Sequence, residues 1–245
     1  MTPIGSNSVL PAKRSDFSVT AADGVQLSGE LALPDWTDPV ATLVCVHPLT
    51  TEGGSMESHL YRKMSWRLPA LAGLAVVRFN LRGAGTGERR SGGEFDACQA
   101  EGLDLGAILS WVRQQELPDP WLVGWSFGTD VVLTFGDRDP VAGAILLSPP
   151  LRYADDSALG RWAASRRPLT VLVPEYDDYL RPPEAEQRFA VIPQADVRAV
   201  AEAAHLWVGE RFVRIVLNEI VRVVAPAAHP LPTEWAGSMT RWRDL

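Results

Sequence analysis

The chain has few cysteines and histidines: two cysteines and four histidines among 245 residues. Two isolated thiols, Cys45 and Cys98, form neither a disulfide framework nor a metal-ligand cluster, so the sequence indicates a reducing compartment and no bound metal. No apolar run approaches the about eighteen residues that a membrane span needs, and the first residues lack the apolar core of a secretory signal. We therefore expect a cytoplasmic protein that does not associate with a membrane.

Positive charge is also scarce. Lysine and arginine number 23 against 30 aspartates and glutamates, which gives a formal net charge of -7, and no basic cluster interrupts this balance. Nucleic acids and anionic membranes are bound through positive surface, so we expect neither as a partner. Small neutral or cationic partners fit this acidic balance better. The sequence also lacks internal repeats, low-complexity segments and linkers, and a hydrophobic fraction of 46% suits one globular domain.

Segments rich in β-branched and apolar residues alternate with amphipathic segments. This alternation predicts an α/β fold with a mostly parallel central sheet and helices on both faces. We expect one domain over 17–225, an N-terminal extension over 1–16 and a C-terminal tail over 226–245 that is either docked or loose. The expected strands are 17–20, 25–33, 41–47, 74–81, 121–124, 143–147, 169–173 and 195–200, and the expected helices are 57–71, 101–115, 127–136, 158–164, 183–190 and 209–224.

A serine lies between two glycines where the strand over 121–124 turns into the helix over 127–136, in Gly124-Trp125-Ser126-Phe127-Gly128. The pattern Gly-x-Ser-x-Gly decides little alone, because it also arises by chance. A serine hydroxyl is a weak nucleophile, so acyl transfer also requires a base, an acid that orients the base, and donors for the oxyanion. The rest of the chain must supply these groups if Ser126 is a nucleophile.

Candidates for the base and the acid follow two later strands. His205 comes directly after the last strand and before the final helix, at the carboxyl edge of the predicted sheet. Asp177 and Asp178 follow the strand over 169–173. The chain order is therefore serine, aspartate, histidine, with both aspartates open at this point.

This arrangement over 17–225 resembles the α/β-hydrolases, in particular small bacterial members without a lid that are related to dienelactone hydrolases and short peptidase-like esterases. The loops that begin at His47-Pro48 and at Arg78 resemble the two loops beside the catalytic pocket of that family. The resemblance implies that the N–H groups of Leu49 and Phe127 form the oxyanion hole. Pro48 stands where many relatives have glycine and has no N–H, so the first donor must follow it.

The resemblance also bears on the acid, because the family pattern Gly-Glu-x-Asp matches Glu175-Tyr176-Asp177, with Pro174 in place of the glycine. It favours Asp177 and leaves Asp178 as the alternative. The segment between the strands over 143–147 and 169–173 has only about twenty residues, too few for a helical lid. We therefore expect an open pocket.

The function that these expectations support is a serine hydrolase of small or exposed acyl esters, which works through an acyl-enzyme and needs no cofactor. Trp125, Trp207 and Tyr179 are the candidates for lining the substrate pocket. A thioesterase, a peptidase or a haloperoxidase-like enzyme would use the same three side chains, and a non-catalytic scaffold with this fold is the remaining alternative. The sequence leaves open the substrate, the oligomeric state and the role of the tail.

Overall fold

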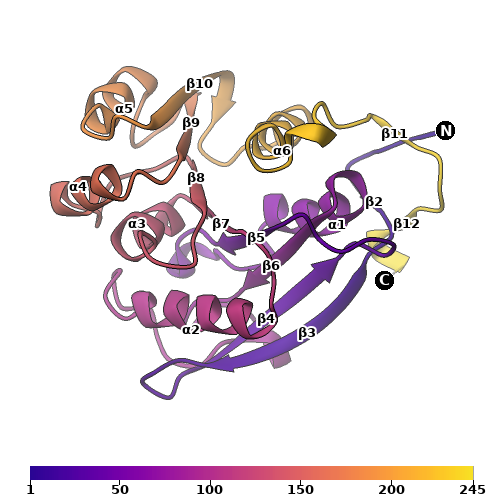
Figure 1. Cartoon of the computed structure of the whole chain (residues 1–245), viewed down its shortest axis with the longest axis horizontal. Coiled ribbons are helices and arrows are strands. Elements are labelled where there is room, and N and C mark those ends of the chain that lie inside the picture. The colour runs from indigo at the N-terminus through magenta and orange to yellow at the C-terminus, as the bar shows by residue number, and fades with distance from the viewer. Residues whose placement is uncertain (245) are drawn as a thin grey trace.

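An eight-stranded sheet forms the centre of the computed structural model, which describes residues 1–244 (Figure 1). Its strand order is β10-β9-β8-β7-β5-β6-β4-β3. Neighbouring strands from β10 to β6 run parallel, and the β3–β4 hairpin joins the edge of the sheet in antiparallel fashion. The strands are β3 (Lys13–Thr20), β4 (Gln26–Leu33), β5 (Ala41–Val46), β6 (Leu74–Phe79), β7 (Pro120–Trp125), β8 (Gly143–Leu147), β9 (Leu169–Tyr176) and β10 (Ala195–Ala204).

Helices cover both faces of the sheet, and each face has its own buried apolar cluster. The first cluster contains Ile108 of α2 and Leu159 of α4, and the second contains Met64 of α1 and Val216 of α6. Within residues 1–244 the α-helices are α1 (His59–Ala72), α2 (Glu101–Gln114), α3 (Phe127–Phe135), α4 (Asp156–Ser165), α5 (Pro182–Phe189) and α6 (Glu210–Val224). Single turns of 3-10 helix are η1 (Thr50–Glu52), η2 (Gly87–Arg89), η3 (Pro226–Ala228) and η4 (Trp242–Asp244).

The predicted fold class is confirmed: the sheet is mostly parallel, and its helices lie on both faces. Between β8 and β9 the chain forms only α4, so this connection contains no lid domain. The largest boundary differences are at β3, which begins at Lys13 instead of residue 17, and at β10, which ends at Ala204 instead of residue 200. β3 is an edge strand whose side chains are half-buried or exposed, so its charged first residues carry no apolar signal. β10 continues past an irregularity between Val200 and Ala204.

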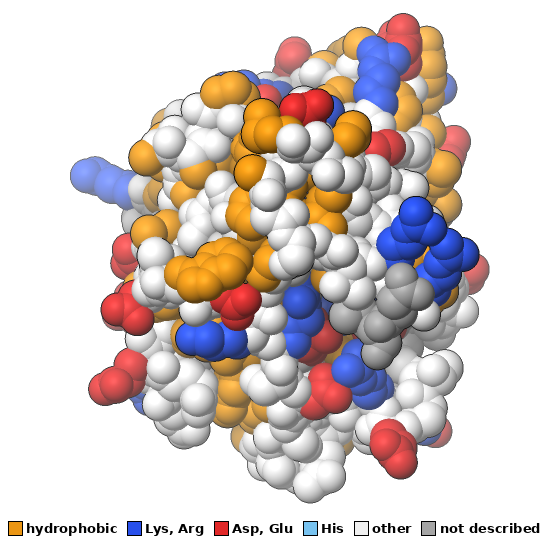
Figure 2. Space-filling model, turned by 90° about the vertical axis from the view of Figure 1, so that its right-hand side faces the viewer, with side chains coloured by type: hydrophobic (Ala, Val, Ile, Leu, Met, Phe, Trp, Pro, Cys, Tyr) orange, Lys and Arg blue, Asp and Glu red, His pale blue; other side chains and the backbone are white. Residues whose placement is uncertain are grey.

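The C-terminal tail is docked against the N-terminal residues, which decides between the two alternatives that the sequence left open. β1 (Thr2–Pro3) pairs with β11 (Glu234–Trp235), and β2 (Ser8–Val9) pairs with β12 (Thr240–Arg241). Both termini therefore lie on the same side of the molecule (Figure 1). On that side, charged side chains of both signs are mixed with apolar ones (Figure 2).

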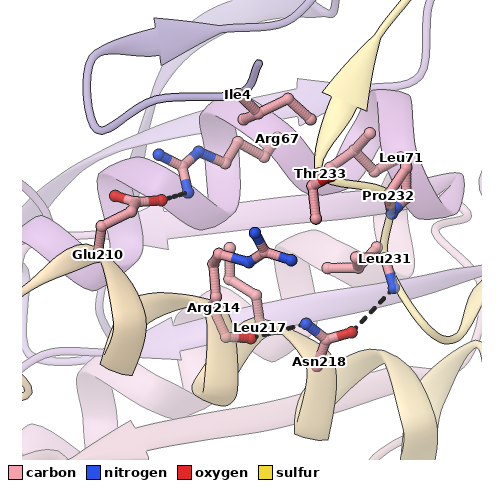
Figure 3. A pocket seen from close by; sticks show the side chains of 10 residues that line it. All are labelled: Ile4, Arg67, Leu71, Glu210, Arg214, Leu217, Asn218, Leu231, Pro232 and Thr233. Carbon is pink, nitrogen blue, oxygen red and sulfur yellow. Dashed lines mark hydrogen bonds and ion pairs between the residues drawn. The ribbon is translucent and has the colours of Figure 1, made fainter.

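A small cavity of about 20 Å³ lies where the two terminal segments meet α1 and α6 (Figure 3). At its wall Arg67 of α1 pairs with Glu210 of α6 and also donates to the Gly5 carbonyl. Asn218 of α6 accepts from the N–H of Leu231 in the tail. The Asn218 contact fastens the tail to α6, and the Arg67 contacts fasten the N-terminal segment and α6 to α1. No helix in the described part of the chain has the length and apolar character of a membrane span.

Two glycines allow α3 to pack directly on the sheet. A β-carbon on Gly128 would overlap the backbone of Val46 at the end of β5, and one on Gly124 would lie 2.7 Å from the Gly128 carbonyl oxygen. Neither obstacle is a flexible side chain, so the strand and the helix would have to separate. The close contact between α3, β5 and β7 therefore depends on these two residues.

Replacing Gly128 with alanine should lower the free energy of unfolding by about 3 kcal/mol or prevent folding, because backbone must move to admit one methyl group. Gly160→Ala is the matched control: Gly160 lies in α4 with nothing within 4 Å of its added β-carbon. The control should be stabilised by about 0.5 to 1 kcal/mol through its helix propensity. Urea unfolding monitored by circular dichroism measures both values, and equal effects at the two sites would contradict the packing argument.

Candidate active site

Ser126 sits in a strained turn between β7 and α3. Its backbone has φ 52° and ψ -122°, a combination that residues other than glycine rarely adopt. The Ser126 N–H donates to the Leu147 carbonyl of β8 at 2.9 Å, and its carbonyl accepts from the Thr129 N–H at 2.8 Å. The turn is therefore held from both sides, with the half-buried Ser126 side chain at its tip.

Three side chains from three different loops form one hydrogen-bonded chain. The Oγ of Ser126 lies 2.9 Å from Nε2 of His205, and Nδ1 of His205 lies 2.9 Å from Oδ2 of Asp177. The loops follow β7, β9 and β10, whose carboxyl ends meet at one edge of the parallel sheet. His205 and Asp177 are both buried. The structure thus brings together the three residues that the sequence singled out.

Of the two aspartates that the sequence offered, Asp177 is the one beside His205. Its Oδ1 accepts from the N–H groups of Tyr179 and Leu180 at 2.9 and 3.3 Å. Burial raises the pKa of Asp177, but the hydrogen bonds from His205 and from these N–H groups outweigh it, and the net pKa lies below the ordinary value of 3.8. Asp177 is therefore an anion at neutral pH. Asp178 is exposed.

Leu49 and Phe127, the expected donors of the oxyanion hole, line the same cavity as Ser126. Within residues 1–244, neither N–H donates to another protein group. His47 fixes the loop that carries Leu49. Its Nε2 accepts from the Leu81 N–H at 2.9 Å, so the ring hydrogen is on Nδ1, which donates to the Pro48 carbonyl at 2.6 Å. Complete burial lowers the pKa of His47 to about 4, and the ring stays neutral.

A cavity of about 120 Å³ opens beside Ser126. The sequence anticipated Tyr179 in its wall, and the Tyr179 ring also packs edge-on against the His205 ring with 4.6 Å between centroids. Apolar side chains make up much of the wall, and Tyr179 and Leu206 are more than half exposed at its rim. The residues around the cavity are Pro48, Leu49, Glu52, Ser126, Phe127, Asp130, Pro150, Arg152, Tyr153, Tyr179, His205 and Leu206.

The expectation that Trp125 and Trp207 line this cavity is wrong. Both side chains are buried in the apolar cluster beneath α1 and α6, on the other side of the sheet from α3. Trp125 is the last residue of β7, where alternation of side chains directs its ring toward Tyr61 of α1, 6.2 Å away between centroids. The neighbour of Trp207, Leu206, reaches the cavity instead.

Asp130 is a cavity residue that sequence reasoning missed. It lies four residues after Ser126, on the same face of α3, and this spacing was a readable signal. Its Oδ1 accepts from the N–H groups of Tyr153 and Ala154 at 3.1 and 3.0 Å, which fixes the loop after β8 as a cavity wall. Within residues 1–244 its Oδ2 has no partner. Burial raises the pKa of Asp130 to about 6.

The acidic residues around α2 are used in structural contacts. Asp104 pairs with Arg82, with a shortest distance of 2.6 Å, and Glu101 accepts from the Asp96 N–H at 2.8 Å. Among residues 1–244 no three His, Cys, Asp or Glu side chains are grouped as metal ligands.

The Asp130→Asn variant should be more stable than the wild type at pH 8 by about 1 to 3 kcal/mol. A carboxyl group whose pKa rises from 3.8 to about 6 on folding opposes folding above pH 6 by about 3 kcal/mol, and this cost disappears as the pH falls below 3.8. Asparagine keeps the acceptor for the two N–H groups, although its amide nitrogen takes over the unpartnered position. The stability difference should therefore shrink between pH 8 and pH 4. Urea unfolding at both pH values checks it, and a difference independent of pH would contradict this reading.

Comparison with known proteins agrees with this fold. A family model described as alpha/beta hydrolase fold matches residues 41–206. An α/β serine hydrolase without a lid from Xanthomonas campestris is 27% identical, with a TM-score of 0.72 over 91% of this chain and 98% of that one. An α/β serine hydrolase homologue from Coxiella burnetii is 24% identical, with a TM-score of 0.73 over 86% and 97%. An esterase from Pyrococcus furiosus is 20% identical, with a TM-score of 0.66 over 88% and 91%.

An uncharacterised curated protein from Rickettsia prowazekii is 30% identical over 116 residues, and the alignment spans 46% of that protein and 46% of this chain. The family match over 41–206 covers more than half of the chain and includes the turn at Ser126 and the loops that carry Asp177 and His205. The chain therefore belongs to the α/β-hydrolase-fold family.

Proposed function

We propose that the protein is a serine hydrolase of carboxylic esters, with Ser126 as nucleophile, His205 as general base and Asp177 as the group that orients the base. One observation carries the proposal: the two successive hydrogen bonds of 2.9 Å from Ser126 to His205 and from His205 to Asp177. A serine becomes nucleophilic when a neighbouring imidazole can accept its proton and an anion holds that imidazole in the correct tautomer.

The reaction starts when Ser126 Oγ attacks the ester carbonyl and His205 Nε2 takes the hydroxyl proton. The Asp177 carboxylate keeps the hydrogen on Nδ1 and stabilises the imidazolium that forms. The free N–H groups of Phe127 and Leu49 bind the oxyanion of the tetrahedral intermediate. His205 then gives its proton to the leaving alcohol, and a water molecule, activated by the same imidazole, hydrolyses the acyl-enzyme and restores Ser126.

The cavity supports a small acyl group or one that projects from a larger molecule. Its volume of about 120 Å³ suits a short acyl chain, and the connection between β8 and β9 is too short to close over a long one. The exposed side chains of Tyr179 and Leu206 at the rim form an apolar surface that the rest of the substrate can contact. Esterase activity is also named for the Pyrococcus furiosus neighbour. The two unpaired cysteines support a cytoplasmic location for the enzyme. The proposed reaction on a small-molecule acyl substrate needs no cofactor, because protein side chains supply the nucleophile and the base.

Purified wild-type protein should hydrolyse p-nitrophenyl acetate or butyrate. Ser126→Ala should lower kcat by on the order of 10⁴-fold or more, and Asp177→Asn by a comparable factor, because the asparagine would stabilise the wrong imidazole tautomer. Asp178→Asn is the matched control next to it in the chain: its exposed side chain should leave kcat almost unchanged.

Parallel assays with acyl-CoA and aminoacyl amides identify the leaving group that the enzyme prefers. Faster turnover of a thioester or an amide than of the oxygen ester would contradict the assignment to carboxylic esters. The roles of Ser126, His205 and Asp177 would be unchanged. Equal losses in Asp177→Asn and Asp178→Asn would contradict the role of Asp177. A wild type that turns over none of these substrates would leave a scaffold with this fold as the better account.

A further inference from the structure

The loop that carries His205 is fastened by side chains from three other parts of the fold. The carbonyl oxygen of His205 accepts from Ser148 Oγ at 3.0 Å and from Trp125 Nε1 at 3.2 Å. The carbonyl of the next residue, Leu206, lies 2.9 Å from Nε2 of His59, which must carry the hydrogen because a carbonyl only accepts. The donors come from the end of β7, from the residue after β8 and from the start of α1.

The two donors to His205 are buried. Ser148 is inaccessible to solvent, and Trp125 is 3% exposed, with its ring against His59 at 5.3 Å and 88° between planes. Hydrogen bonds in such a dry site are stronger and hold their groups more rigidly than exposed ones. Both lone pairs of the His205 carbonyl are used, so the peptide unit is fixed in orientation as well as in position.

Ser148 adopts a backbone conformation that serine disfavours. Its φ of 51° lies in the left-handed region, where glycine would cost nothing. A strained residue persists where the surroundings over-determine it, and strain of this kind concentrates at functional sites. At this position the serine provides a hydroxyl, which glycine lacks, and that hydroxyl donates to the His205 carbonyl.

Regular sheet structure does not hold His205 by itself. The pairing of β10 with β9 shifts between Val200 and Ala204, and Glu202 and Trp207 have positive φ of 61° and 53°. On the solvent side, Leu206 and Val208 are 55% and 72% exposed. The His205 backbone therefore follows an irregular path with little packing on the solvent side, and the buried donors hold it from the inner side.

We propose that Ser148 and Trp125, supported by His59, are positioning residues that fix the His205 backbone so that its imidazole stays within hydrogen-bond distance of Ser126. This inference rests on the proposed function, because it assigns a purpose to the position of the base. Ser148, Trp125 and His59 are not among the described residues that line the cavity beside Ser126. Loss of the donors should therefore impair the chemical step and leave substrate binding unchanged.

The test uses Ser148→Gly, which removes the hydroxyl and relieves the strained φ. The relief of the strained backbone and the loss of one hydrogen bond act in opposite directions and are similar in size, so the melting temperature should stay close to that of the wild type. We expect kcat for p-nitrophenyl acetate to fall about 10- to 100-fold with KM unchanged, since small misplacement of a catalytic group costs factors of this size. The rate of labelling by a fluorophosphonate should fall in parallel.

Arg166→Gly is the matched control, because Arg166 also has a positive φ, 57°, and lies exposed at the end of α4. It should leave kcat and KM at wild-type values. Trp125→Phe, which keeps a ring and removes the N–H donor, carries the same expectation as Ser148→Gly and serves if that variant does not fold. An active wild type whose folded variants keep kcat within about twofold, or lose activity through KM alone, would overturn the inference and leave the proposed function intact. A wild type without any turnover would overturn both.

Discussion

The site depends on how closely helix α3 approaches the ends of β5 and β7. Gly128 and Gly124 permit this approach, since a β-carbon at either would meet backbone atoms. The approach forces the chain through the strained turn at Ser126, which places the hydroxyl at the carboxyl edge of the sheet. The parallel strands β9 and β10 end at the same edge, and their loops bring the aspartate and the histidine to the serine.

Much of the fold could be predicted because parallel strands are buried on both faces and therefore appear as continuous apolar runs. β8 matches its predicted limits of 143–147, and the other central strands and helices differ by a few residues at their ends. The length of the edge strand β3 was underestimated because most of its side chains are exposed, and its charged first residues are also typical of loops. Docking of the tail depends on two-residue strand pairs with the first residues of the chain, and pairs so short leave no periodic signal.

The sequence placed Ser126, Asp177 and His205 correctly because the chain order and the strand ends determine which loops meet. Strand positions alone left Asp177 and Asp178 open, and only the resemblance to the family favoured Asp177, since neighbouring residues in a loop differ in direction and the structure gives that direction. The two tryptophans were misplaced for a related reason. Aromatic residues next to a catalytic loop are equally compatible with the cavity and with the core, and Trp125 faces the core, where its N–H holds the His205 carbonyl.

The central claim is that Ser126 is activated by His205, and labelling with a fluorophosphonate probe followed by intact-mass spectrometry tests it most directly. Phosphonylation requires an activated serine and no knowledge of the natural substrate. The account predicts one adduct per wild-type chain and no adduct on Ser126→Ala or, over the same time, on His205→Ala. An unlabelled but folded wild type, or labelling that persists without Ser126 or His205, would contradict it.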